Sequence, residues 1–239
     1  MGDFTKAFEY FKKGSLDPRI LISVFPEYSQ DSSFDEFRRT LKQNFGFESV
    51  NELAEKLKAK ATTEASKQEC TALLRKYLEY VRTTPKISGA RKEEVDTCLA
   101  KVYARTSASA LVDFLKSDND VSLAHLEPFL VDLKKYSALA LLFKSRGESS
   151  KALDTWSKLA SKQLTDPDFT GLDEAVSFLG SVEEESLIWK HAPWLFVADP
   201  SKAVEVTNHT LSPVFEVIRN PNSFFFFFSF FWRTDLFKG

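Results

Sequence analysis

The chain has 239 residues, a formal net charge of −2 at pH 7 and only 8 glycines. Its 43% hydrophobic and 28% charged residues are typical of a folded globular protein and exclude a largely disordered chain. A net charge so close to zero argues against a nucleic-acid-binding protein. Because Gly is scarce and strand-like alternation of β-branched residues is almost absent, the composition favours an all-α protein.

Four helices are predicted in the first 60 residues. The first lies between Asp3, its N-cap, and Gly14. The second begins at Pro18, because a proline in the first helical position loses no hydrogen bond, and ends at Pro26. Gly46 stops the third, and an S-x-x-E capping box at Ser49 begins the fourth. The apolar stripes of the first, third and fourth helices are Phe4, Ala7, Phe8 and Phe11; Phe34, Phe37, Leu41 and Phe45; and Leu53 and Leu57.

The middle of the chain predicts longer helices and two loops. A helix over Glu64–Arg82 is followed by a loop at residues 83–89. Two helices come next, then a loop at residues 118–120 and a helix at residues 129–134, which Pro128 should begin or kink. The stripes are Leu73, Leu74, Tyr77, Leu78 and Val81; Val95, Cys98, Leu99, Val102 and Tyr103; and Leu111, Val112, Phe114 and Leu115.

Residues 136–159, YSALALLFKSRGESSKALDTWSKL, predict two short amphipathic helices joined by a tight turn. Gly147 lies where a helix C-terminus needs a residue that tolerates positive φ. Ser149 or Ser150 can cap the second helix. Since a lone hairpin cannot bury both of its stripes, this segment is predicted to be one unit of a stacked helical array.

Further helices are predicted after a loop at residues 166–168, at about residues 172–179, 184–191 and 200–208. The acidic residues 183–185 are interpreted as first-turn charge at a helix start. Hairpins therefore recur about every 30 to 40 residues, which is typical of helical solenoids. We predict an all-α fold of stacked helical hairpins.

The C-terminal segment from Asn220, NPNSFFFFFSFFWRTDLFKG, breaks this pattern. Its apolar run is far shorter than the roughly 20 residues of a transmembrane helix, and it lacks the polar side of a core helix. Two interpretations remain: an interfacial aromatic anchor, whose usual basic face is missing, and a sequence accident such as read-through into thymine-rich noncoding DNA. We therefore assign residues 1–218 to the solenoid and 219–239 to a disordered or artefactual tail.

No catalytic, cofactor-binding or metal-ligating residue is predicted, and no cofactor. The histidines lie outside HExxH spacing, and no GxSxG, Walker or GxGxxG motif occurs. Cys70 and Cys98 form no CxxC pattern and are expected to be buried, reduced thiols. Charged residues near the N-terminus interrupt any secretory signal, so a cytosolic location is expected. The remaining candidates, assigned no role in metal binding or assigned to packing, are His125, His191 and His209, and Trp156, Trp189 and Trp194.

Three sequence segments follow one another along the chain: CLAKVYARTSASALVDFL, LEPFLVDLKKYSALALLFKSRGESSKALDTWSKLA and WLFVADPSKAVEV. They resemble the clathrin-heavy-chain-repeat α-solenoid of vacuolar sorting subunits in the HOPS and CORVET tethers, in particular the Vam6/TGF-β receptor-associated protein branch. The earlier stretch AFEYFKKGSLDPRILISVFPEY is similar to the segment that follows the β-propeller in that branch. The resemblance covers about residues 4–217.

The resemblance implies a right-handed, TPR-like α-solenoid and a non-enzymatic scaffold that tethers endosomal, lysosomal or vacuolar membranes before fusion. The partners that it implies are other HOPS/CORVET subunits and Rab-type small GTPases, with peripheral membrane contact through the complex and no nucleic acid. Two alternatives are a clathrin-like coat or TPR-type trafficking adaptor, and an enzyme that uses dispersed carboxylates. Since the family's β-propeller and C-terminal half have no counterpart here, we expect a fragment or a truncated gene model.

Overall fold

The computed structural model describes residues 4–14, 17–23, 25, 27–28, 63–84 and 89–203. Within these residues the secondary structure is helix and loop without a strand, so the predicted all-α class is confirmed there. The chain divides into two compact units, Met1–Gly147 and Glu148–Gly239, which we call unit 1 and unit 2. The boundary falls in the turn of the predicted hairpin at residues 136–159.

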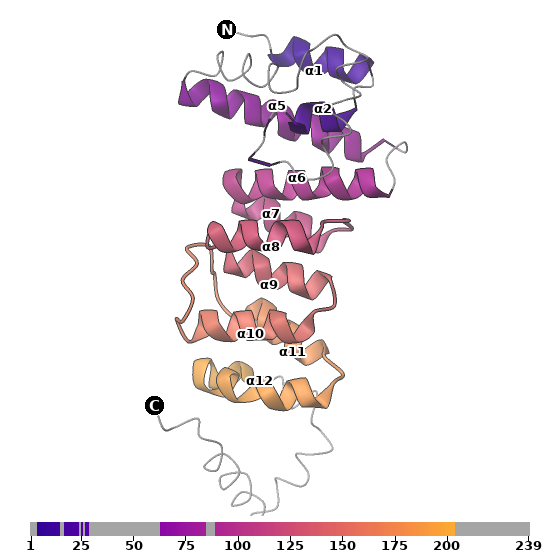
Figure 1. The fold of residues 1–239 in the computed structure, drawn as a ribbon. Helices are drawn as coiled ribbons and strands as arrows, with labels where there is room; N and C mark the ends of the chain where they lie inside the picture. Colours follow the sequence, from indigo (N-terminus) through magenta and orange to yellow (C-terminus); the bar gives the residue numbers. More distant parts are fainter. Residues whose placement is uncertain are drawn as a thin grey trace, which may run out of the picture. The chain divides into compact units, whose positions relative to one another are not determined.

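Unit 1 is a stack of helices in which neighbours in the chain pack on one another. Figure 1 shows α5, α6, α8 and α9 lying one below the next. Contacts join α5 to α6, α6 to α7 and α8, and both α7 and α8 to α9, while α1 and α2 pack on α5. Packing between near neighbours in the chain is the pattern of stacked helical hairpins. The helices are α1 (Phe4–Lys13), α2 (Pro18–Ser23), α5 (Glu64–Arg82), α6 (Ala90–Thr106), α7 (Ala108–Lys116), α8 (Leu123–Asp132) and α9 (Tyr136–Ser145).

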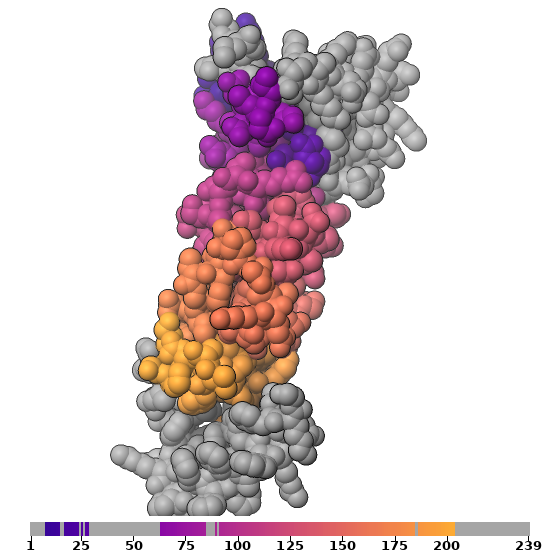
Figure 2. Space-filling view, turned by 90° about the vertical axis from the view of Figure 1, so that its left-hand side faces the viewer, coloured from indigo at the N-terminus to yellow at the C-terminus, as the bar shows by residue number. Residues whose placement is uncertain are grey.

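The core of unit 1 follows from the apolar stripes of its helices. On α5 the buried face contains Leu74, Tyr77 and Leu78, at the spacing of an amphipathic helix. In contrast, every residue from 138 to 143 on α9 is buried, because this helix packs on both α7 and α8. In the space-filling view α5 (purple) and α6 (magenta) form adjoining bands of surface (Figure 2). The apolar stripes of these helices thus form the core of unit 1.

Unit 2 contains α10 (Ser149–Ala160), α11 (Asp173–Ser181) and α12 (Glu185–Ala198) among its described residues. These three helices pack pairwise on one another. Trp156 on α10 is buried, and its ring centroid lies 5.8 Å from that of Phe178 on α11. Ile188 and Leu195 on α12 are also buried. A further helical segment begins at Pro200, as predicted, and is described as far as Ala203.

Several predicted helix limits are confirmed. The helix α5 has the predicted limits, α1 ends just before Gly14, and α2 begins at Pro18. Gly147 has a φ of 75°, as the turn requires. Other predictions lie outside the described residues: the Asp3 cap, Pro26, the helices between residues 34 and 57, the Ser49 capping box, His209 and the aromatic tail at 219–239.

Two helices are longer than predicted because each continues through a proline. The helix α8 spans Leu123–Asp132 with Pro128 inside it, whereas the prediction placed a helix at residues 129–134. Leu126 and Leu130 are fully buried, and their burial outweighs the one backbone hydrogen bond that Pro128 cannot donate. Similarly, α12 runs past His191 and through Pro193.

The predicted serine cap of α10 is wrong. Glu148 is the N-cap residue, and its side chain makes no capping hydrogen bond. Its carbonyl accepts the first helical hydrogen bond, from the Ala152 N–H at 3.0 Å. Ser149 is therefore already inside the helix, where its hydroxyl cannot serve as the N-cap acceptor.

Candidate functional site

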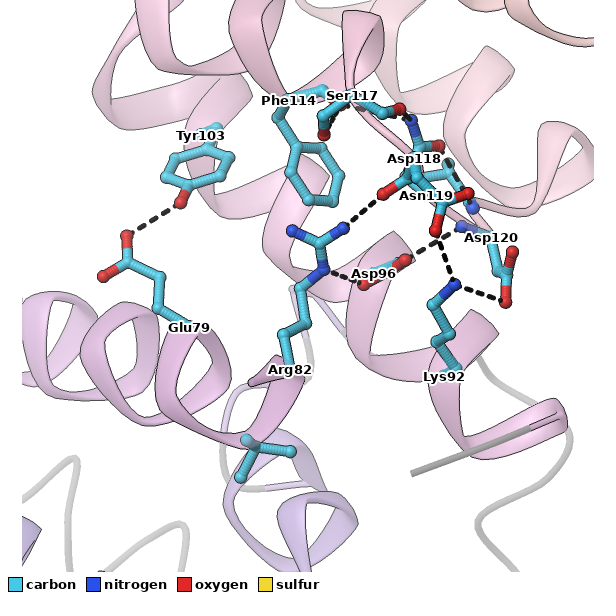
Figure 3. Close-up of polar contacts among 12 residues, drawn as sticks. Glu79, Arg82, Lys92, Asp96, Tyr103, Phe114, Ser117, Asp118, Asn119 and Asp120 are labelled. Atoms are coloured by element: carbon cyan, nitrogen blue, oxygen red, sulfur yellow. Dashed lines mark hydrogen bonds and ion pairs between the residues drawn. The ribbon is translucent and has the colours of Figure 1, made fainter. Parts of the chain in front are cut away.

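A polar network surrounds residues 117–121, the loop between α7 and α8 (Figure 3). We call these residues the clasp loop. Their sequence is Ser-Asp-Asn-Asp-Val, and such residues form turns because their short side chains bond nearby backbone groups. The Ser117 hydroxyl, for example, donates to the Phe114 carbonyl at 2.7 Å. The end of α7 and the beginning of the loop are thus fixed locally.

Asn119 is the buried centre of the clasp loop. Its Nδ2 donates to the carbonyls of Ser117 at 2.7 Å and Phe114 at 3.1 Å. Carbonyls in the last turn of a helix have no helical partner, so this side chain satisfies groups that α7 leaves open. Its Oδ1 accepts a hydrogen bond from Arg146 Nη2 at 2.6 Å. Asn119 therefore links the end of α7 to the end of α9.

Asp96 on α6 is 0% exposed and holds the loop from the other side. Its Oδ1 lies 2.7 Å from Arg82 Nε, and its Oδ2 accepts from the Asp120 backbone N–H at 2.8 Å. Burial raises the pKa of Asp96, while the Asp120 N–H, Arg82 and Lys92 oppose that rise. The carboxylate thus joins the last turn of α5 to the clasp loop.

Arg82 makes three different contacts from the C-terminal residue of α5. Besides Asp96, its Nη2 donates to the Asp118 carbonyl at 2.6 Å. Its guanidinium also lies over the Phe114 ring, 4.6 Å from the centroid, where the ring quadrupole attracts a cation. In Figure 3 the side chain rises from α5 between Asp96 and Phe114. One residue thereby contacts α6, α7 and the clasp loop.

Arg146, the C-cap residue of α9, closes the network. Its Nε and Nη2 donate to the Val121 carbonyl at 3.1 and 2.9 Å, in addition to the bond with Asn119. A planar guanidinium suits this convergent geometry, because its donors lie in a fixed fork. The Ser122 N–H, just after the loop, donates to Thr97 Oγ1 of α6 at 2.9 Å. Contacts from α5, α6 and α9 therefore hold the clasp loop.

The rim of the network is more exposed. Lys92 Nζ lies 3.3 Å from Asp118 Oδ2 and 3.1 Å from Asp120 Oδ2. The Asp118 side chain is 94% exposed, so solvent screens this pair and it adds little to stability. Tyr103 donates to Glu79 Oε1 at 2.7 Å; burial and then Glu79 raise the pKa of this tyrosine.

The network joins helices, and its carboxylates are already paired. Arginine and lysine side chains already pair with the carboxylates that would otherwise be candidate metal ligands. In the described part of the chain, no group of three His, Cys, Asp or Glu side chains is placed to hold a metal ion. What the geometry does supply is a fixed spacing between successive helices.

The residues considered in the sequence have separate local environments. His125 Nδ1 shares a hydrogen bond of 2.9 Å with Ser122 Oγ, and His191 is buried on α12. Cys70 and Cys98 are free and buried, as predicted, and burial raises the pKa of both thiols. Trp189 is 39% exposed, which departs from its predicted packing role.

The sequence reasoning missed the residues that build the network, namely Arg82, Asp96, Asn119 and Arg146. One signal was present: Asp96 lies next to Val95 and near Cys98 in an apolar stripe, where a charge needs a partner. The Arg146 signal was weaker, because a turn before Gly147 tolerates many polar residues. No spacing rule connects these two positions.

Comparison with known proteins identifies the family. Residues 95–196 match the model described as vacuolar sorting protein 39 domain 1. The chain is 35% identical over 204 residues to the transforming growth factor-β receptor-associated protein 1 homolog of Danio rerio. The chain belongs to the vacuolar sorting protein 39/TGF-β receptor-associated protein family. The predicted family resemblance is therefore confirmed.

Other relatives show the extent of the match. The human (Homo sapiens) transforming growth factor-β receptor-associated protein 1 is 31% identical over 218 residues. Vacuolar protein sorting-associated protein 3 of Schizosaccharomyces pombe is 21% identical over 235 residues. These alignments cover 91% and 86% of this chain but 24% and 25% of the relatives, so the chain spans about a quarter of their length. No solved structure matches the chain.

The family match overlaps most of the network. The matched range contains Asp96, the clasp loop and Arg146, whereas Arg82 precedes it. None of the helices that the structure describes is both long and apolar enough to cross a membrane.

Proposed function

We propose that this chain is a non-enzymatic scaffold segment of an endolysosomal membrane-tethering complex of the HOPS or CORVET type. Its role would be in vesicle-mediated protein transport and membrane fusion. The observation that carries the proposal is the family match at residues 95–196, in a chain whose described residues are helical throughout their regular structure. The relatives' names, vacuolar sorting protein and receptor-associated protein, support a trafficking role.

The packing in each unit suits a scaffold. A tether subunit has to present partner-binding surfaces at fixed spacing, and helices that pack mainly on near neighbours provide extended surfaces. The clasp loop supports this role, because it fixes α5, α6, α7 and α9 through buried polar contacts. From the family resemblance we also propose a right-handed, clathrin-repeat-like arrangement over residues 1–218, with residues 219–239 outside it.

The proposed partners follow from the family alone. They are other HOPS or CORVET subunits and Rab-type small GTPases, with peripheral contact with endosomal, lysosomal or vacuolar membranes through the complex. No residue of the described surface is assigned to any of them. The two alternative functions, a clathrin-like coat or TPR-type adaptor and an enzyme, are distinguished by the experiment that follows.

The test is affinity purification of the tagged full chain from cells, followed by identification of the proteins that it recovers. We expect the vacuolar sorting tether subunits with the unaltered chain and with Asp118→Ala, which alters only an exposed carboxylate. Asp96→Ala, which breaks the buried network, should reduce their recovery. Recovery of clathrin instead would overturn the tether assignment in favour of an adaptor, and turnover of ester, phosphate or glycoside substrates would favour an enzyme.

A further inference from the structure

A buried histidine in unit 2 has a defined protonation state. His191 on α12 is 2% exposed, and the Trp194 indole Nε1–H donates to its Nδ1 at 3.2 Å. An indole nitrogen can only donate, so Nδ1 must be the unprotonated nitrogen of the ring. The neutral ring therefore carries its proton on Nε2.

The other ring nitrogen faces a carboxylate on a neighbouring helix. His191 Nε2 lies 3.7 Å from Asp154 Oδ1 on α10, beyond hydrogen-bond distance, and is buried without a hydrogen-bond partner. The same Asp154 oxygen lies 3.0 Å from Lys190 Nζ, which also lies 3.3 Å from Ser150 Oγ. Lys190 and His191 of α12 thus face the same carboxylate, Asp154 of α10.

The charged groups around the ring come from two helices. Asp154 of α10 and Lys190 of α12 act on His191, and the third helix of the cluster, α11, carries Asp173 and Glu174. Asp173 pairs with Lys202 at 2.6 Å. Burial lowers the pKa of His191, Asp154 raises it and Lys190 lowers it further, so the pKa lies below the ordinary value of 6.5. The ring is neutral at neutral pH.

We propose that His191 and Trp194 form a proton-sensitive latch within α12, beside the contact of this helix with Asp154 of α10. When Nδ1 takes a proton from solvent, both ring nitrogens become donors and the Trp194 hydrogen bond is lost. The ring then carries a positive charge, and its Nε2–H competes with Lys190 for Asp154. Since Pro193 cannot donate a backbone hydrogen bond to the preceding turn, the second half of α12 depends more on side-chain contacts, and acid should loosen it.

The direction of the pH effect follows from linkage. The unfolded chain takes up the histidine proton near pH 6.5, whereas the folded chain takes it up only at lower pH. Below pH 6.5 the unfolded state therefore binds more protons, and the stability of unit 2 falls as the pH falls. The latch is closed above this range.

The test is a pH titration of the full chain by NMR, following the His191 ring nitrogens and the Trp194 indole N–H. We expect the Nε2–H tautomer at pH 7.5, a midpoint below 6.5, and a change of the Trp194 signal at the same pH. Trp194→Phe should raise the midpoint, because the neutral ring loses a hydrogen bond, and Asp154→Asn should lower it. Trp189→Phe, on the same helix, is the matched control and should leave the midpoint unchanged.

Two results would overturn the latch. One is an Nδ1–H tautomer at neutral pH, and the other is a Trp194 signal that stays constant while His191 titrates. Both are measured on the unaltered chain, so they decide the question even if a variant fails to fold.

Discussion

The clasp loop in unit 1 and the His191 cluster in unit 2 both join helices through a buried ionisable group, yet the two groups differ in how closely their charged partner approaches. Asp96 has a guanidinium at 2.7 Å and a backbone N–H at 2.8 Å. His191 Nε2 has a carboxylate at 3.7 Å and no hydrogen-bond partner. An ion pair at 2.7 Å and a backbone hydrogen bond fix the packing around Asp96, although its Oδ1 makes no hydrogen bond, whereas the longer contact of His191 with Asp154 depends on protonation.

Removing Asp96 from the clasp-loop network should have the largest effect. We predict that Asp96→Ala lowers the free energy of unfolding of unit 1 by about 3 kcal/mol, because Arg82 and the Asp120 N–H lose their buried partner. Chemical denaturation measures the change. Asp118→Ala, at the exposed rim, is the control and should leave the midpoint unchanged; equal effects of the two variants would show that the buried pair has no special role.

Asn119→Ala should come next, at about 2 kcal/mol, because carbonyls of α7 and the Arg146 guanidinium lose hydrogen bonds. Asn119→Asp should be worse, since a carboxylate would then face the carbonyls that the Nδ2 group now contacts. The same denaturation experiment compares the two variants. If Asn119→Asp were as stable as the unaltered chain, the assigned orientation of this side chain would be wrong.

Alkaline pH should destabilise unit 1 selectively, the counterpart of the acid effect in unit 2. Burial raises the pKa of Tyr77 to about 12, from an ordinary value of 10.0. Stability present below pH 10 is therefore lost as the pH rises through 12, by about 2 kcal/mol. All 6 tyrosines lie in residues 1–147, so unit 2 lacks this dependence.

Chemical denaturation between pH 9 and pH 11.5 can separate the two units. Tyr77→Phe should weaken the alkaline loss in unit 1, and Tyr10→Phe, at a residue that is 71% exposed, should not. Tyr103, whose pKa is also raised, should leave a residual dependence. An alkaline loss that Tyr77→Phe leaves unchanged would exclude Tyr77 as its source.

The smallest change in stability should come from replacing a lysine of positive φ by glycine, and it should be equal in the two units. Lys134 after α8 and Lys162 after α10 have φ values of 55° and 59°, a region that strains residues with a Cβ atom. Lys134→Gly and Lys162→Gly should each stabilise their unit by about 0.5 kcal/mol. Lys158→Gly, inside α10, is the control and should cost about 1 kcal/mol. Destabilisation by either of the first two would contradict the positive φ at that site.

How far the sequence predicted the fold depended on whether the signal was local. The limits of α5 were predicted because its stripe and its end signals lie within one segment. The start of α8 was placed too late because proline was expected to begin or kink the helix at Pro128, whereas burial of Leu126 and Leu130 depends on neighbouring helices.

The network could not be predicted for the same reason. Asp96 and Asp120 are 24 positions apart, and Asn119 and Arg146 are 27 apart. Their pairing depends on how α6, α7 and α9 pack, which an apolar stripe does not specify. The sequence did show that residues 118–120 form a loop. It did not show that side chains of α5, α6 and α9 hold this loop.

Hydrogen–deuterium exchange of the Asp120 and Ser122 backbone amides tests most directly whether the clasp loop is built into the helical stack. Both amides donate to side chains of α6, at 2.8 and 2.9 Å. We predict protection comparable to that of the central residues of α6, and loss of that protection in Asp96→Ala. Exchange at the rate of an unprotected surface loop in the unaltered chain would contradict the central role of this network.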